Sequence, residues 1–176
     1  MLNFKVIDNF FEDDVCEEIC NSIQSASFPL YYCNAVSLKH RKDHYYFTHM
    51  LVNNSVSVSG FNNIANHFLD QISPSYVYRI QVNAYPKEPD HNLHGFHIDL
   101  DHTHKVALWY VNTNNGYTIL KDPTSQEDVR IESVKNRMLF FDGNIFHSSV
   151  THTDTNLRHV VNMNYLPSIE IEDYFK

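Results

Sequence analysis

A series of short apolar segments begins near Ser75 and continues almost to the end of the chain. The first, residues 76–85, alternates apolar and polar side chains over much of its length and stops at the proline-containing stretch 86–90. Such a pattern is typical of a strand that buries one face. Further candidate strands follow at residues 106–111, 117–120, 129–131, 137–141, 146–150 and 158–165. Short strands at this spacing predict a mainly β fold, a double-sheet jelly roll or double-stranded β-helix.

The residues before this series predict helices that flank the sheet. After the acidic stretch 12–14, apolar residues recur every four positions and predict a short helix that ends between residues 24 and 27. A second helix is predicted from about residue 58 to residue 72, an opening strand and turn are expected within 4–11, and a strand is expected at 44–52. We therefore expect one domain over residues 1–176, with about 1–74 as helical support and 75–166 as the jelly-roll core.

Composition and charge exclude several classes of protein. A hydrophobic content of 43% and an aromatic content of 14% favour a packed, strand-rich fold over a disordered chain. The formal net charge of −8 argues against general binding to nucleic acid or to anionic membranes, and the basic run at residues 39–42 is more typical of a solvated loop. No apolar run approaches the ~20 residues of a membrane span. Cys16 and Cys20 are expected to be reduced residues on one helix face, which suggests a cytoplasmic protein.

The triplet His97-Ile98-Asp99 is the strongest candidate for a functional site. In an extended segment, side chains two positions apart point to the same face, so His97 and Asp99 can both reach one metal ion. His147, which follows the apolar run 138–141, is a candidate third ligand. Two histidines and one carboxylate form the facial triad of non-haem Fe(II) oxygenases. Asp99 is preferred to Asp101 because it lies two positions after a histidine.

With Arg158 eleven positions after His147, these residues resemble the iron/2-oxoglutarate-dependent dioxygenases, in particular their prolyl 4-hydroxylase-like branch. The resemblance covers about residues 76–165, and a weaker similarity to the family's opening strand and turn is present at 4–11. It implies that His97, Asp99 and His147 hold Fe(II). It further implies that Arg158 pairs with the distal carboxylate of 2-oxoglutarate, and that Tyr85 adds a hydroxyl to this pocket.

The implied reaction uses O2 to hydroxylate a C–H bond of a substrate, with release of succinate and CO2. The substrate would be a peptidyl residue, for example proline, or a small molecule. Arg158 also fits this interpretation on physical grounds, because strand alternation points Arg158, Val160 and Asn162 the same way. An arginine on an inward face is costly without an anionic partner, and a bound dicarboxylate would supply one.

The sequence departs from the family pattern at two places. Val160 stands two positions after the arginine, where many relatives carry Ser or Thr, and the pair Asn115-Gly116 stands where relatives often have two glycines. Both departures concern the geometry of the 2-oxoglutarate pocket more than the metal ligands.

Two other interpretations remain at this stage. His102 and His104 are also two positions apart, so the chain could be a cupin-like metal-binding protein without oxygenase activity. No suitably spaced Glu follows them, and both are expected at the rim of the site. The chain could also be a binding module that lost its cofactor, although the three ligands and the arginine argue against this. His94 is expected either beside the site or on the surface. Trp109 is expected in the core, with substrate stacking as the less favoured alternative.

Overall fold

The structure is a computed structural model that describes residues 2–34, 45–122 and 128–168. The described part contains two helices, α1 (Asp13–Ile23) and α2 (Asn62–Ile72). Its strands are β1 (Phe4–Ile7), β2 (Tyr31–Cys33), β3 (Tyr46–Asn53), β4 (Val56–Ser57), β5 (Tyr76–Pro86), β6 (Lys105–Tyr110), β7 (Tyr117–Leu120), β8 (Val129–Glu132), β9 (Arg137–Asp142), β10 (His147–Val150) and β11 (Leu157–Leu166).

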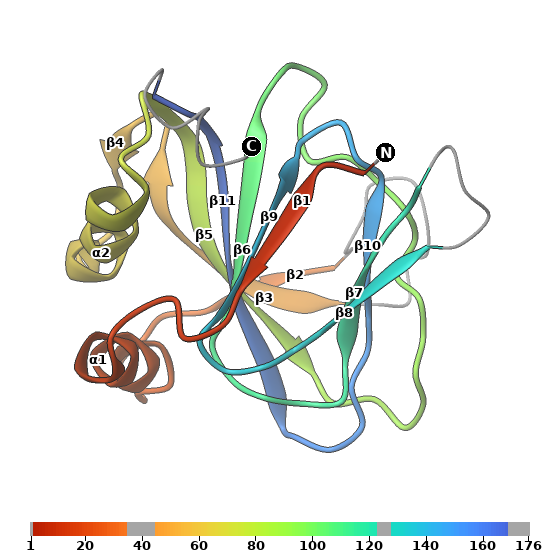
Figure 1. The fold of residues 1–176 in the computed structure, drawn as a ribbon. Helices are drawn as coiled ribbons and strands as arrows, with labels where there is room; N and C mark the ends of the chain where they lie inside the picture. The colour runs from red at the N-terminus through yellow and green to blue at the C-terminus, as the bar shows by residue number, and fades with distance from the viewer. Residues whose placement is uncertain (1, 35–44, 123–127, 169–176) are drawn as a thin grey trace.

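The strands form two antiparallel sheets that face each other. The major sheet has eight strands in the order β1-β9-β6-β11-β5-β3-β2, with β4 paired to β3, and the minor sheet has the order β10-β7-β8. In Figure 1 the minor sheet lies to the right of the major sheet and the two helices lie to its left. The architecture is a jelly roll with flanking N-terminal helices, which confirms the fold class predicted from the sequence.

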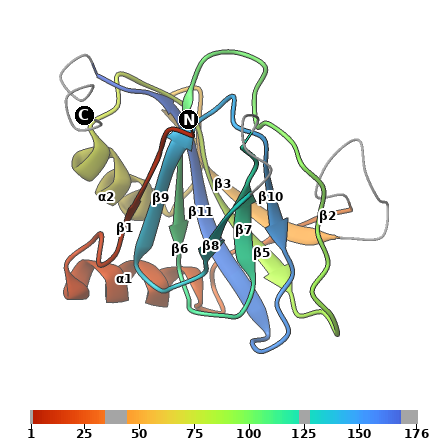
Figure 2. The same ribbon diagram turned by 45° about the vertical axis from the view of Figure 1, so that its right-hand side comes forward.

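Strand alternation gives the major sheet two different apolar faces. On one face, Trp109 and Met163 are fully buried against α1 and α2, together with Phe68 of α2. On the opposite face, Leu108 and Val160 belong to a second core that extends to Leu120 of the minor sheet. Figure 2 shows the helices and the minor sheet on either side of the major sheet. The helices therefore support the sheet from behind, and the space between the sheets is left for a site.

The N-terminal part contributes more than the helical support predicted for residues 1–74. β1 pairs with β9 and β3 pairs with β5, so both belong to the major sheet. The opening strand ends at Ile7, and the rest of the stretch 4–11 lies outside strands and helices, as expected for a strand followed by a turn. α2 begins at Asn62 rather than near residue 58, because Val56 and Ser57 form β4 and the hydroxyl of Ser59 accepts a hydrogen bond from the amide of Phe61.

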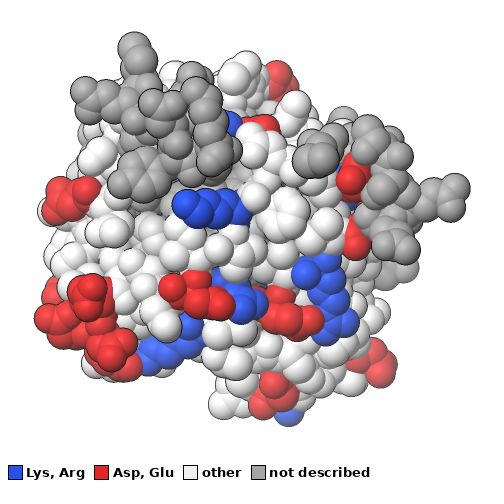
Figure 3. Space-filling model, in the orientation of Figure 1, with Lys and Arg blue, Asp and Glu red and all other residues white. Residues whose placement is uncertain are grey.

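Surface charges of both signs lie side by side on the face shown in Figure 3, and acidic side chains gather over α1. The basic run at residues 39–42 lies outside the described residues. No helix in the described ranges is long and apolar enough to cross a membrane. Cys16 and Cys20 are buried free thiols on α1, as the sequence predicted.

Candidate metal centre

Three possible metal ligands from separate parts of the chain meet between the sheets. His97 and Asp99 lie between β5 and β6, and His147 is the first residue of β10. The backbone amides of His97 and His147 each donate to the other residue's carbonyl oxygen at 3.0 Å. Nε2 of His97 and Nε2 of His147 lie 3.8 Å and 3.9 Å from Oδ1 of Asp99. The three ligand atoms lie within 4.8 Å of one another, so small side-chain rotations would let one ion reach all three.

Backbone carbonyl groups orient both imidazoles. Nδ1 of His97 lies 3.2 Å from the carbonyl oxygen of Gly95, and Nδ1 of His147 lies 3.2 Å from that of Ile145. A carbonyl oxygen can only accept a hydrogen bond, so each Nδ1 carries a proton, and Nε2 is the nitrogen that is left to bind a metal. This arrangement is typical of histidines that bind metals, whose second nitrogen donates to a carbonyl or carboxylate group.

The Asp99 carboxylate is held on both of its oxygens. Oδ1 lies 2.9 Å from Nη2 of Arg79, and Oδ2 accepts hydrogen bonds from the side-chain amides of Asn162 (3.1 Å) and Asn164 (2.8 Å). Burial alone would raise the pKa of the Asp99 carboxyl, but His147, Arg79 and the two amides outweigh burial and hold this pKa well below its usual range. Asp99 is therefore a carboxylate, the form that a metal requires, and its hydrogen bonds fix its position.

Burial lowers the pKa of His147 below its ordinary value; the Asp99 carboxylate opposes this shift, while His97 adds to it. The ring is therefore neutral at physiological pH. Neutral imidazoles and an ionised carboxylate are the protonation states in which such groups bind metals.

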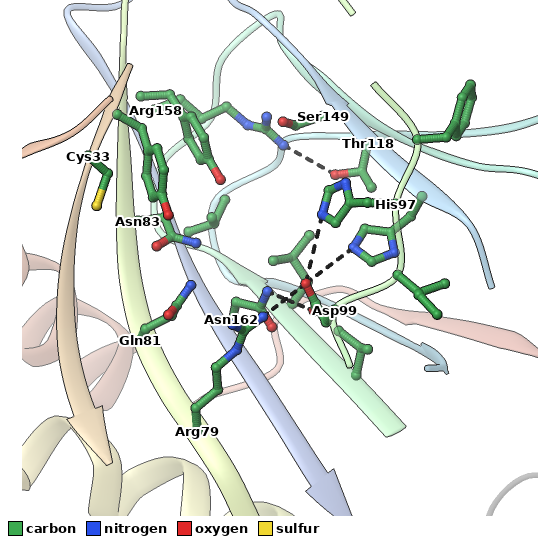
Figure 4. Close-up of a pocket in the computed structure, with 18 of the residues that line it drawn as sticks. Cys33, Arg79, Gln81, Asn83, His97, Asp99, Thr118, Ser149, Arg158 and Asn162 are labelled. Carbon is green, nitrogen blue, oxygen red and sulfur yellow. Dashed lines mark hydrogen bonds and ion pairs between the residues drawn. The ribbon is translucent and has the colours of Figure 1, made fainter. Parts of the chain in front are cut away.

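The cluster opens into a cavity of about 1000 Å³ between the two sheets. Alternate residues of β5 and β11 line it on the major sheet, together with residues of β2, β3, β6 and β9. Figure 4 shows Arg158 above Asp99 and Arg79 below it, with Gln81 and Asn83 along the same wall as Arg79. Arg158, Val160 and Asn162 all line the cavity, so the shared orientation predicted from alternation is confirmed.

Arg158 is 1% exposed, and no carboxylate pairs with it within the described residues. Its Nε donates to the hydroxyl of Ser133 at 3.0 Å and its Nη2 donates to the hydroxyl of Thr118 at 3.2 Å, while Nη1 is buried without a hydrogen-bond partner. Burial lowers the pKa of the guanidinium, although an arginine side chain remains charged at physiological pH. A bound anion would offset the cost of such a buried cation and pair with its unused donor.

The sequence matches no family model and no curated protein significantly. Solved structures do match its fold. An oxidoreductase of the 2OG-Fe(II) oxygenase family from Burkholderia pseudomallei has a TM-score of 0.70 at 12% identity, over 93% of this chain and 85% of that chain. A prolyl hydroxylase from Trichoplax adhaerens, in complex with a peptide fragment of hypoxia inducible factor, has a TM-score of 0.68 at 16% identity, over 95% and 84%. HygX from Streptomyces hygroscopicus, with nickel and 2-oxoglutarate bound, has a TM-score of 0.61 at 12% identity, over 96% and 84%.

The chain has the fold of the 2OG-Fe(II) oxygenases. Within this oxygenase fold, the structure brings the predicted residues His97, Asp99, His147 and Arg158 to one cavity. Tyr85 also lines this cavity, beside the guanidinium of Arg158, whose Cζ lies 5.8 Å from the centre of the Tyr85 ring.

Other histidines of the segment have different surroundings from those predicted. His104 is buried at 4% exposure rather than at the rim, and its Nδ1 donates to the carbonyl oxygen of His102 at 2.7 Å. His102 is exposed, and neither residue belongs to a group of three metal-ligating side chains within the described ranges. His94 lies beside the site, where its ring stacks on Tyr85.

The prediction from sequence did not include Arg79 and Asn164 beside Asp99, or Thr118 and Ser133 beside Arg158. It included the inward orientation of Asn162 but not its hydrogen bond to Asp99. The hydroxyls of Thr118 and Ser133 accept hydrogen bonds from Arg158, and they come from β7 and from the residue after β8. A signal for Arg79 did exist in the sequence. Arg79 alternates along β5 with Gln81, Asn83 and Tyr85, so these four polar or aromatic residues lie on one face of a buried strand.

Proposed function

We propose that the protein is an Fe(II)- and 2-oxoglutarate-dependent hydroxylase that uses O2 to oxidise a C–H bond of its substrate. His97, Asp99 and His147 would hold the metal, and Arg158 would bind the distal carboxylate of 2-oxoglutarate. The observation that carries the proposal is the buried guanidinium of Arg158, which has an unpaired Nη1 and shares a cavity with the three-residue cluster.

The donor set fits a ferrous ion. Two neutral imidazoles and one carboxylate leave coordination positions open for other ligands, as in the 2-His-1-carboxylate sites of non-haem Fe(II) oxygenases. When bound, the iron with 2-oxoglutarate and O2 supplies the oxidising chemistry, which converts 2-oxoglutarate to succinate and CO2 while the substrate gains a hydroxyl group.

The chain itself supplies binding and orientation. The hydroxyls of Thr118 and Ser133 hold the guanidinium of Arg158 in place, and Tyr110 donates to Thr118 at 2.8 Å. Tyr85 would complete the pocket from β5. Val106, Leu108 and Val160 line the same cavity with apolar surface, which keeps bulk water away from the anion and strengthens its attraction to Arg158.

The fold neighbours support the proposal. HygX binds nickel and 2-oxoglutarate in its structure, and the Trichoplax prolyl hydroxylase binds a peptide. We propose by analogy that the substrate is a peptidyl residue or a small molecule that enters the same cavity. Free, buried Cys16 and Cys20 are consistent with a cytoplasmic location, which we also propose.

The proposal is tested by turnover of 2-oxoglutarate. Protein reconstituted with Fe(II) and 2-oxoglutarate without oxygen is exposed to O2, and succinate is measured for the wild type, His97→Ala and Arg158→Gln. We expect the wild type to form succinate slowly and His97→Ala to form none. Arg158→Gln should form succinate only at a much higher concentration of 2-oxoglutarate. Metal-loaded protein that forms no succinate and does not bind 2-oxoglutarate would instead favour the cupin-like interpretation.

A further inference from the structure

We infer that the substrate is a small molecule with a carboxylate, and that Arg79 is the residue that binds this carboxylate beside the metal. The inference rests on the proposed function and specifies the class of substrate. Arg79 extends from β5 into the cavity, and its side chain is 24% exposed, so a ligand can reach it.

The charges of the cavity favour a second anion. Among the described residues that line it, the side chains with a permanent charge are Arg79, Asp99 and Arg158. A divalent ion and two guanidinium groups together carry four positive charges, whereas Asp99 and 2-oxoglutarate carry three negative ones. One positive charge remains in a cavity partly shielded from water, where an unbalanced charge is costly. An anionic substrate would balance it.

The two arginines extend from widely separated backbone positions of the major sheet. Arg158 pairs with Tyr85 across the sheet and Arg79 pairs with Asn164, six residues along each strand. This offset corresponds to about 20 Å between the two backbone positions. Figure 4 shows the two side chains on opposite sides of Asp99. A five-carbon dicarboxylate whose distal end binds Arg158 therefore does not need Arg79.

Arg79 also has free binding capacity. Nη2 contacts Oδ1 of Asp99 and Nε donates to Asn164, whereas Nη1 makes no hydrogen bond within the described ranges. Oδ1 is the oxygen of Asp99 that faces both imidazoles. A metal bound to Oδ1 would weaken the attraction between this oxygen and Arg79. The guanidinium would then be the strongest anion-binding group left on this side of the metal.

The neighbours of Arg79 indicate what else the ligand carries. The side chain of Gln81 makes no hydrogen bond within the described part of the chain, and Oδ1 of Asn162 is buried without a donor. Both residues line the cavity next to Arg79 and Asp99. An unpaired acceptor beside a guanidinium whose Nη1 is unused fits a molecule that has an N–H or O–H donor close to its carboxylate. An amino acid has this combination of groups.

The experiment measures ligand binding without turnover. Wild type is loaded with Ni(II) and saturating 2-oxoglutarate and is screened by thermal unfolding against the common L-amino acids and their carboxamides. The affinities of acids that raise the unfolding midpoint are then measured by calorimetry. We expect at least one acid to bind, and its carboxamide to bind at least about tenfold more weakly, because the carboxamide lacks the charge that Arg79 recognises.

Variants identify the residue responsible. We expect Arg79→Gln to weaken binding of the acid at least about tenfold and to remove the preference for acid over carboxamide, with a partial preference kept by Arg79→Lys. Arg130→Gln is the matched control, because Arg130 is an exposed arginine that pairs with Glu132 outside the cavity. Arg130→Gln should bind the acid like the wild type.

Three outcomes would overturn the inference. The first is that no acid binds, and the second is that carboxamides bind as tightly as acids. The third is that Arg79→Gln weakens the binding of 2-oxoglutarate as strongly as Arg158→Gln does. The third result would mean that Arg79 binds 2-oxoglutarate rather than the substrate. Failure of the proposed function would appear earlier and differently, as the absence of any shift in the wild-type midpoint on adding Ni(II) and 2-oxoglutarate.

Discussion

Each histidine of the metal cluster is oriented by a carbonyl group two residues earlier in its own chain segment. Gly95 performs this role for His97, and Ile145 for His147. Gly95 has a φ of 105°, which L side chains rarely adopt, so glycine lets the chain turn and place His97 opposite His147. The local sequence therefore determines ring orientation as well as the identity of the ligand.

The first prediction concerns these ligands. His147→Ala should weaken the binding of Ni(II) by more than about 100-fold. Loss of a residue that only supports a metal ligand lowers metal affinity by up to about 100-fold, and loss of the ligand itself should cost more. His102→Ala is the control, since His102 is exposed and lies outside the cluster. Calorimetric titration of metal-free protein measures both. Equal losses for the two variants would show that the metal binds elsewhere.

The second prediction separates stability from binding at Arg158. Arg158→Met replaces a buried, incompletely paired cation with an apolar side chain of similar length. The free energy of unfolding of the protein without ligands should stay unchanged or rise by about 1–4 kcal/mol, while 2-oxoglutarate binding is lost. Urea unfolding and calorimetry measure the two effects. A strong loss of stability would mean that the arginine is a structural residue rather than a ligand-binding one.

At the scale of single elements, the alternation of strands explains what the sequence could and could not predict. Periodicity identified β5 and β11 nearly to their ends, and with them the inward orientation of Arg158. It could not identify the partners of Asp99, because the position of Asn164 opposite Arg79 depends on the register between two strands 85 residues apart. A register irregularity between Asn164 and Tyr165 makes this pairing still harder to infer from sequence.

The HxD segment shows the same limit. Extended geometry predicted that His97 and Asp99 would share a face, and the two residues do converge on one point. The segment pairs with β10 only through isolated bridges, however, and not as a strand. His104 was misjudged for a related reason. Its burial depends on Gly143, which lies far away in sequence and packs directly under the imidazole ring.

The third prediction tests the support that helices give to the sheet. Phe68 of α2 packs edge-to-face on Trp109 of β6 and on Phe11, with ring centres 5.6 Å and 5.1 Å apart. Phe68→Ala should lower the free energy of unfolding by about 3–5 kcal/mol. Tyr31→Ala, at an aromatic residue that is 62% exposed, should cost less than about 1 kcal/mol.

Because Phe68 lies on the opposite face of the sheet from the cavity, Phe68→Ala should leave Ni(II) affinity nearly unchanged at temperatures where the variant is folded. A large loss of metal affinity in folded Phe68→Ala would contradict the separation between the helix-covered core and the site.

At the scale of the whole molecule, several buried histidines make stability depend on pH. Burial lowers the pKa of His159 to about 4, and it also lowers the pKa values of His49 and His152. Each ring is neutral in the folded state but binds a proton below about pH 6.5 when the chain unfolds. The stability that such a histidine contributes is therefore complete above this pH and is lost as the pH falls toward the folded-state pKa.

The fourth prediction follows from these shifts. The free energy of unfolding of metal-free protein should fall steadily from pH 7 to pH 4, with about 3 kcal/mol from His159 alone. His159→Gln should flatten this decline. Urea unfolding at successive pH values provides the measurement. Constant stability between pH 7 and pH 5 would contradict the burial of neutral rings.

The central claim is that one cavity holds a metal at His97, Asp99 and His147 and a dicarboxylate at Arg158. The most direct measurement is a crystal structure of the protein with Ni(II) and 2-oxoglutarate, with the metal located by its anomalous scattering. We predict one metal peak between these three side chains and a carboxylate paired with Nη1 of Arg158. A metal bound at other residues, or 2-oxoglutarate that leaves Arg158 unpaired, would contradict the account.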